Sequence, residues 1–194
     1  MERVDQHPTI QTLRTIAPPY LHLLTAARIE VNRICSVAGF GGLVARHLRA
    51  RRMTTVHGLW DEFAAAFQFP WYFGYNWAAF DECLSDDMDW LPLTGYVIGI
   101  MDAEALLTEE QSRLRVFIEI VQDAGETYRQ PMVRGDSTDR LALPFHAVFQ
   151  AEESQMAQLR ERLLAAGAML DDILPLPPIR KRPLPLDLGA ASVP

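Results

Sequence analysis

Residues 69–84 have the sequence Phe69-Pro70-Trp71-Tyr72-Phe73-Gly74-Tyr75-Asn76-Trp77-Ala78-Ala79-Phe80-Asp81-Glu82-Cys83-Leu84, and the rest of the chain is organised around them. The stretch begins as an aromatic loop that is interrupted by Pro70 and Gly74. Asn76 is a favoured N-cap residue, whose side-chain oxygen can accept a hydrogen bond from a free amide of a first helical turn. The stretch therefore predicts a loop followed directly by a helix that begins near Asn76.

The predicted helix has two chemically different faces when successive residues are placed about 100° apart. One face is apolar and consists of Trp77, Ala79, Phe80, Cys83 and Leu84. The opposite face consists of Ala78, Asp81, Glu82, Ser85 and Asp86. Carboxylates near the start of a helix are favoured by the helix dipole. The helix is therefore expected to bury its apolar back and to present an acidic front.

The composition is that of a folded protein. About 49% of the 194 residues are hydrophobic, and the chain contains four Trp, nine Phe and five Tyr. This length fits one domain with extensions, or less readily two small domains. The formal net charge of -7 argues against a general nucleic-acid binder, since phosphate binding requires a surplus of Lys and Arg. An acidic protein is better suited to a basic partner, and the alternative is that the mild acidity serves only solubility.

The cysteines and the apolar runs bear on localisation. Cys35 and Cys83 are the only cysteines, and they have no CxxC spacing. The start of the chain lacks the apolar segment of a secretory signal, and no apolar run approaches the ~20 residues that a membrane helix needs. We therefore expect a cytoplasmic protein with reduced thiols and no membrane partner. Cys83, on the apolar back, is expected to be a core residue.

Hydrophobic periodicity and turn signals predict the remaining elements. Residues 1–17 are expected to be irregular, and residues 26–38 have no clean period but favour a helix weakly. A capping-box pattern at Thr108 predicts a helix from there to about Gly125, followed by a polar loop over 126–143. The predicted strands are 20–24, 43–48, 95–101 and 145–150, and the other predicted helices are 57–68 and 152–167.

This order of elements predicts an α/β fold. The continuous apolar run at 95–101 is typical of a strand that is buried on both faces. Strands that are joined through helices are expected to be parallel, in a three-layer fold or a sheet that is largely covered by helices. Beyond residue 171 the chain is rich in proline, which predicts either a flexible or loosely docked tail or a recognition peptide.

Three other patterns have weaker functional implications. The basic cluster Arg49-Ala50-Arg51-Arg52 fits either an anion site or a solvated loop. The aspartates that follow the organising helix lack the glycine and the final glutamate of an EF-hand, so no metal site is predicted. The five histidines are scattered, and neither a nucleophile motif nor a glycine-rich phosphate loop is present. We therefore predict no catalytic residues, no cofactor and no enzymatic activity.

The organising stretch resembles the barstar family of ribonuclease inhibitors. The resemblance rests on the pattern Phe69-Pro70-x-Tyr72-Phe73-Gly74-x-Asn76-Trp77-x-Ala79-Phe80-x-x-Cys83-Leu84. It continues through the strand at 95–101, the helix that contains Val116-Phe117-Ile118-Glu119 and the strand at 145–150, and covers roughly residues 43–151. It implies a three-stranded parallel sheet packed by helices. The domain organisation that we expect is an N-terminal extension over 1–42, in which an added strand and helix are possible, a domain that resembles the family over 43–170, and a proline-rich tail over 171–194.

The resemblance also implies a function and a binding face. The founding member of the family places an acidic helix and the loop before it into the active site of a basic ribonuclease. Residue by residue, Tyr72, Gly74 and Asn76 match the contact loop, Glu82 matches the dominant acidic position, and Glu119 matches an acidic contact on a later helix. Carboxylates on a rigid helix can pair with the basic groups of a nuclease site and block its substrate.

Two positions depart from the family pattern. Ala78 stands where the family has Asp in the motif Asn-Trp-Asp-Ala, and Asp81 stands where the founding inhibitor has Trp. We predict that Ala78, Asp81, Glu82, Ser85 and Asp86 form a retuned acidic face for a basic ribonuclease or nuclease toxin, in an inhibitor of immunity or antitoxin type. The alternative is an interaction or regulatory module that has kept the fold and lost inhibition. The oligomeric state is not indicated by the sequence.

Overall fold

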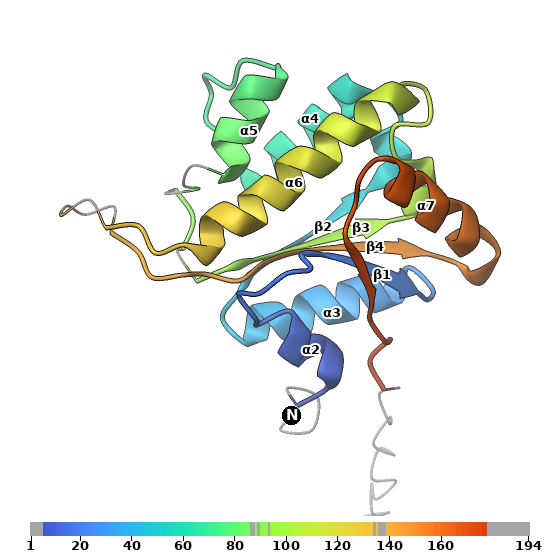
Figure 1. The fold of residues 1–194 in the computed structure, drawn as a ribbon, viewed down its shortest axis with the longest axis horizontal. Helices are drawn as coiled ribbons and strands as arrows, with labels where there is room; N and C mark the ends of the chain where they lie inside the picture. Colours follow the sequence, from blue (N-terminus) through green and yellow to red (C-terminus); the bar gives the residue numbers. More distant parts are fainter. Residues whose placement is uncertain are drawn as a thin grey trace, which may run out of the picture.

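The protein is described by a computed structural model, which covers residues 6–85, 88, 90–92, 94–133, 135 and 139–177 (Figure 1). Short 3-10 turns lie at Ala50–Arg52, Ala103–Ala105 and Gln111–Arg113. The helices and strands are, in chain order, α2 (Pro8–Thr12), β1 (Leu21–Thr25), α3 (Ile29–Phe40), β2 (Val44–Arg49), α4 (Val56–Phe67), α5 (Trp77–Ser85), β3 (Tyr96–Met101), α6 (Leu114–Arg129), β4 (Phe145–Ala151), α7 (Glu153–Ala165) and β5 (Leu170–Asp172). Each predicted strand is confirmed with small shifts in its bounds, and the segment that favoured a helix only weakly forms α3.

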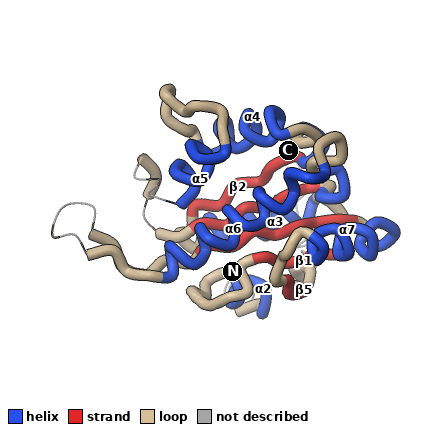
Figure 2. The backbone as a smooth tube through the Cα atoms, turned by 45° about the horizontal axis from the view of Figure 1, so that its top comes forward, coloured by secondary structure: helices blue, strands red, loops and turns tan. Residues whose placement is uncertain are grey.

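The strands form one five-stranded parallel sheet in the order β2-β3-β4-β1-β5 (Figure 2). Parallel pairing was predicted and is confirmed. The expectation of three strands is wrong, because β1 and β5 extend the sheet beyond β4. Leu21 is in register with Ala147 of β4 on one side and with Leu170 of β5 on the other. Strand β1 is buried along almost its whole length because its side chains pack on both faces of the sheet, Leu21 and Leu23 in one core cluster and Leu24 in the other.

Helices cover both faces of the sheet (Figure 1). Helices α4, α5, α6 and α7 lie on one face, and α2 and α3 lie on the other. Alternate residues of a strand point to opposite faces, and β4 illustrates this: Phe145 and Phe149 pack with the larger group of helices, whereas Val148 packs with α3. The predicted α/β architecture with a helix-covered parallel sheet is therefore confirmed. Within the described ranges, no helix is both long enough and apolar enough to cross a membrane.

Two glycines allow close packing of helices against other parts of the chain. A Cβ atom on Gly99 of β3 would lie 2.4 Å from Cγ1 of Val31 and 2.9 Å from Sγ of Cys35, so only glycine lets α3 approach the sheet this closely. Gly125 was expected to end a helix, but α6 continues to Arg129. The ring of Tyr20 packs where a Cβ atom on Gly125 would lie, 2.4 Å from the nearest ring carbon. Gly125 therefore makes room for a ring and does not end the helix.

The predicted capping box at Thr108 does not start a helix. The backbone there pairs with the segment before α4 instead, since the amide of Leu107 donates to the carbonyl of Met53 at 2.8 Å. The carboxylate of Glu110 accepts a hydrogen bond from the amide of Val56, at the start of α4. Helix α6 begins only at Leu114, after a 3-10 turn. Glu110 thus serves a different helix from the one predicted.

The two ends of the described chain lie together. Residues 1–17 were expected to be irregular, but Pro8–Thr12 form α2, which buries Ile10. The hydroxyl of Thr9 donates to the carbonyl of Leu174 at 2.6 Å and accepts from its amide at 3.2 Å. Ile173 belongs to the same buried cluster as Ile10. The start of the proline-rich segment is therefore docked against α2, and the rest of that segment, residues 178–194, is outside the described residues.

Candidate acidic binding site

The apolar back of α5 anchors the helix on α4 and α6. Phe80 is fully buried, and its ring contacts that of Phe63 edge-on with centroids 5.0 Å apart. The centroid of Phe117 on α6 is 6.3 Å from that of Phe80. Cys83 and Leu84 are buried beside them, as the helical period predicted. These contacts hold α5 rigidly between two other helices, which fixes the direction of its opposite face.

Asn76 caps the start of α5, as predicted from its residue type. Its Oδ1 accepts a hydrogen bond from the amide of Ala79 at 3.0 Å, and its Nδ2 donates to the carbonyl of Gly74 at 3.1 Å. A Cβ atom on Gly74 would lie 2.9 Å from that Nδ2 atom. The glycine therefore makes space for the capping side chain. Two of the predicted contact residues, Gly74 and Asn76, thus build the turn that leads into the helix.

The front of α5 carries exposed carboxylates on one side of the helix. Ala78, Asp81 and Glu82 are all exposed, and Ser85 is partly exposed. The hydroxyl of Ser85 donates a hydrogen bond to Oδ1 of Asp81 at 2.9 Å, which restrains the direction of this carboxylate. Asp86, the last residue predicted for this face, is outside the described residues. The structure brings the other four predicted residues, Ala78, Asp81, Glu82 and Ser85, together on one side of α5. Their role in binding a partner stays a prediction.

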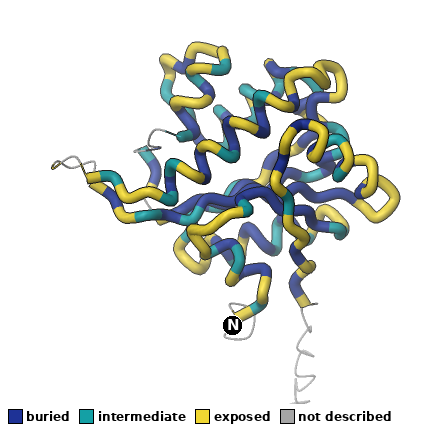
Figure 3. Tube along the Cα trace, in the orientation of Figure 1, coloured by how far each residue is buried: buried dark blue, intermediate teal, exposed yellow. Residues whose placement is uncertain are grey.

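The loop before α5 is largely exposed (Figure 3), and three of its aromatic residues are open to solvent. Trp71 is 96% exposed, Tyr72 is 68% exposed and Tyr75 is 47% exposed. Phe73 points inward instead, and its ring lies 5.1 Å from that of Phe69. Of the three exposed rings, only Tyr72 was predicted as a contact residue. The pattern of aromatic residues between Pro70 and the helix cap would have indicated Trp71 and Tyr75 as well, because so short a loop cannot bury every ring.

Glu119, the predicted acidic contact on the later helix, is exposed on α6, but it is not a free acidic group. Oε1 of Glu119 lies 2.8 Å from Nε of Arg115 in an ion pair four residues apart on the helix. The hydrogen bond to Glu119 raises the pKa of Arg115 above its ordinary value. Arg115 therefore offsets the charge of Glu119. Sequence reasoning missed this pair, although the i,i+4 spacing of opposite charges was a usable signal.

The thiol of Cys83 has no nucleophilic character. Burial raises its pKa, the negative charge of Glu82 acts in the same direction, and the two together bring it to about 11. A thiol with this pKa is protonated near neutral pH, and only the thiolate is nucleophilic. Cys83 is therefore a core residue of α5, in agreement with its predicted place on the apolar back.

The fold and the site define the class of protein: an α/β protein with a parallel sheet that displays an acidic helix and an exposed aromatic loop. A comparison with protein families matches residues 43–150, more than half of the chain, to the family described as Barstar (barnase inhibitor). The chain therefore belongs to the barstar family, which is a family of inhibitors and not of enzymes. No curated protein and no solved structure matches the chain in the corresponding comparisons.

The matched range explains the difference in strand number. It contains β2, β3 and β4, the three strands that the resemblance implied. It also contains the aromatic loop, α5 and α6. Strands β1 and β5 lie outside the matched range, and so do helices α2, α3 and α7. This protein thus joins two further strands to the side of the family sheet formed by β4.

Proposed function

We propose that this chain inhibits a basic ribonuclease by placing α5 and the aromatic loop over the active site of the enzyme. The observation that carries the proposal is the exposed front of α5. Asp81 and Glu82 project from a helix whose back is fixed by Phe80 in the core. A helix that is held in place presents its carboxylates in a fixed direction, so they can pair with Arg, Lys and His side chains without the cost of ordering the backbone.

The aromatic loop supplies apolar contact area next to these charges. Trp71 is almost fully exposed, and it lies beside Tyr72 with ring centroids 5.8 Å apart. Trp and Tyr are over-represented among the residues that dominate binding energy in protein interfaces. The net charge of -7 adds a longer-range attraction for a basic enzyme. Loop and helix together give the surface both an apolar anchor and a charge pattern.

The specificity of the inhibitor is proposed to differ from that of the founding family member. Ala78 removes one carboxylate from the family pattern, and Asp81 supplies another at the next position along the same face. Moving a carboxylate changes which cation it can pair with and whether the pairing is bidentate. We infer a partner whose basic groups are arranged differently, such as a nuclease toxin against which this chain acts in the cytoplasm as an immunity or antitoxin-type protein.

The test is a ribonuclease assay with a panel of basic ribonucleases, barnase included, in which the purified chain is titrated against a fixed RNA substrate. Glu82→Gln and Asp81→Asn keep the shape of each side chain and remove its charge. Each variant should weaken inhibition by well over tenfold, as for central charge pairs. Glu161→Gln is the matched control, because Glu161 is an exposed carboxylate on α7.

Inhibition that is unchanged in both α5 variants would remove the acidic helix from the mechanism. The second candidate function is an interaction module that has lost inhibition, and the missing carboxylate at Ala78 is the observation that favours it. That function predicts that no member of the panel is inhibited. It further predicts that Ala78→Asp alone does not create inhibition.

A further inference from the structure

A basic cavity lies where β2 and β3 end and α3 begins. Its volume is about 580 Å³, and its lining includes Arg28, Arg49, Arg51, Arg52 and Asp102, which we call the arginine cavity. In open parallel sheets, ligands bind in crevices outside the carboxyl ends of the strands. The sequence left the basic cluster at 49–52 open between an anion site and a solvated loop. The structure shows that this cluster is one wall of a cavity.

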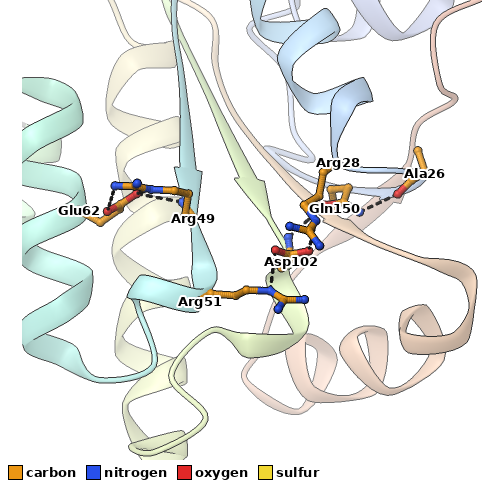
Figure 4. Close-up of polar contacts among 7 residues, drawn as sticks. All are labelled: Ala26, Arg28, Arg49, Arg51, Glu62, Asp102 and Gln150. Atoms are coloured by element: carbon orange, nitrogen blue, oxygen red, sulfur yellow. Dashed lines mark hydrogen bonds and ion pairs between the residues drawn. The ribbon is translucent and has the colours of Figure 1, made fainter.

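Asp102 holds two of these arginines in place (Figure 4). Its Oδ1 lies 3.0 Å from Nε of Arg28, and its Oδ2 lies 2.8 Å from Nε of Arg51. The side chain of Asp102 is only 11% exposed, whereas those of Arg28 and Arg51 are 56% and 63% exposed. Both arginines contact the carboxylate through Nε. Their terminal amino groups are therefore available for a ligand.

Asp102 is itself fixed by the ends of two other strands. Its backbone is in the left-handed region, with φ 53°, and its amide donates to Oε1 of Gln150 at 3.0 Å. Gln150 is fully buried at the end of β4, and its Nε2 donates to the carbonyl of Ala26, just after β1, at 2.6 Å (Figure 4). The buried amide thus ties together the ends of β1, β3 and β4. The arginines that pair with Asp102 are consequently positioned before any ligand arrives.

The charges around the cavity do not balance. Arg49 is neutralised by a two-pronged contact with Glu62, at 2.7 Å and 3.0 Å. Arg28 and Arg51 share the single carboxylate of Asp102. Arg52 has no carboxylate within ion-pair distance among the residues that the structure describes. Among the residues that line the arginine cavity and their ion-pair partners, two positive charges are therefore left over, on a chain whose net charge is -7.

The surroundings favour an anion at the Arg52 side of the cavity. The first turn of α3, a helix of 12 residues, borders the cavity, and the helix dipole favours negative charge there. Glu104 and Glu152 line an adjoining cavity that also borders Arg28 and Arg51. Neither carboxylate lines the arginine cavity itself. An anion is thus repelled from the adjoining cavity and attracted toward Arg52.

We propose that the arginine cavity binds the phosphate group of a small phosphorylated molecule, through the guanidinium groups of Arg51 and Arg52. A phosphate dianion matches the surplus of two positive charges, and planar guanidinium groups match the geometry of phosphate oxygens. The volume of the cavity admits more than the phosphate alone. None of its lining residues belongs to the aromatic loop, α5 or α6, so this site is independent of ribonuclease inhibition.

The test is isothermal titration calorimetry of the full chain with inorganic phosphate, pyrophosphate and AMP, and with adenosine as a probe without phosphate. At least one of the three phosphate-bearing probes should bind saturably with one site per chain, and adenosine should not. Arg52→Gln should lower that affinity by about tenfold or more, the size of a lost hydrogen bond to a charged group. Because Arg52 is exposed, this variant is expected to fold, which its melting temperature checks.

Arg113→Gln is the matched control, since Arg113 is an exposed arginine outside the cavity, and it removes the same charge. This control should leave the affinity unchanged. The proposal is overturned if none of the phosphate-bearing probes binds saturably. It is equally overturned if Arg52→Gln and Arg113→Gln bind the probes as tightly as the unmodified chain does. Tighter binding of AMP than of pyrophosphate would indicate a nucleotide as the ligand. Tighter binding of pyrophosphate than of AMP would indicate a simpler phosphate compound.

Discussion

A buried pair of histidines makes the stability of this protein depend on pH. His22 and His146 are both fully buried, and Nε2 of His22 lies 2.9 Å from Nδ1 of His146. Nε2 of His146 lies 2.8 Å from the carbonyl oxygen of Thr15. A carbonyl oxygen only accepts, so Nε2 of His146 carries its proton and Nδ1 accepts from His22. Nδ1 of His22 has no hydrogen-bond partner among the described residues. The pair is therefore held neutral.

The sign of the pH effect follows from the direction of the two pKa shifts. Burial lowers the pKa of His22 to about 3, with a further contribution from His146, and burial lowers that of His146 to about 4. Both groups titrate near pH 6.5 in the unfolded chain. Below that pH the unfolded chain takes up protons that the folded chain does not. The contribution of the neutral pair to the free energy of unfolding is therefore fully present well above pH 6.5. It decreases as the pH falls toward the folded pKa values.

The size of the decrease in the free energy of unfolding depends mainly on proton uptake by the unfolded chain, because both imidazoles of the folded chain stay neutral down to about pH 5. Between about pH 7.5 and pH 5 each histidine lowers the free energy of unfolding by about 2 kcal/mol, and the pair by about 4 kcal/mol. This decrease is a large fraction of the free energy of unfolding of a typical domain, which is roughly 5–15 kcal/mol. Acid should therefore destabilise this protein well before its carboxylates are protonated.

The assay is urea denaturation of the unmodified chain and of the double variant His22→Leu and His146→Leu, at several pH values across this range. The double variant removes both polar partners together, which limits the cost of leaving one of them unpaired. The carbonyl of Thr15, an exposed residue, can bond to water instead. The unmodified chain should lose about 4 kcal/mol more than the variant on acidification. Parallel losses in the two proteins would refute the assignment of the pH effect to this pair.

Three further predictions concern single substitutions. Gly99→Ala should lower the free energy of unfolding by about 1–3 kcal/mol in urea denaturation, because its Cβ atom would overlap Val31 and Cys35; an unchanged midpoint would contradict this packing. Asn76→Ala should lower the same quantity by about 1 kcal/mol through loss of the α5 cap, and full stability would show that the cap contributes nothing. If the proposed function is right, Ala78→Asp should tighten binding to barnase by more than about 1 kcal/mol in a competition assay, most strongly at low salt, and unchanged affinity would refute a role for this position.

The properties of the organising helix were predictable because they are local. The helical period separates the buried back of α5 from its exposed front, and the residue type of Asn76 indicates the cap that the structure confirms. The apolar run at 96–101 likewise indicates a strand that is buried on both faces. Each of these features depends on residues within one or two turns of one another. The family could be recognised from the same stretch for the same reason.

What the sequence left open involves residues that are distant along the chain. Gly125 was misread because its partner is Tyr20, and the capping-box pattern at Thr108 was misread because Glu110 accepts a hydrogen bond from the start of another helix, at Val56. The position of β1 in the sheet was likewise undetermined, and β5 was not predicted as a strand at all, since pairing with a distant strand leaves no periodic pattern that names the partner.

The arginine cavity is the clearest functional case. Arg51 meets Asp102 across 51 residues, and Gln150 reaches Ala26 across 124. By itself the sequence determined the family, the parallel α/β class and the two faces of the acidic helix, because periodicity and caps act over a few residues. Only the tertiary structure decided the five-stranded sheet, the neutral histidine pair and the surplus of positive charge in the cavity, because burial and charge balance depend on which strand ends the fold brings together.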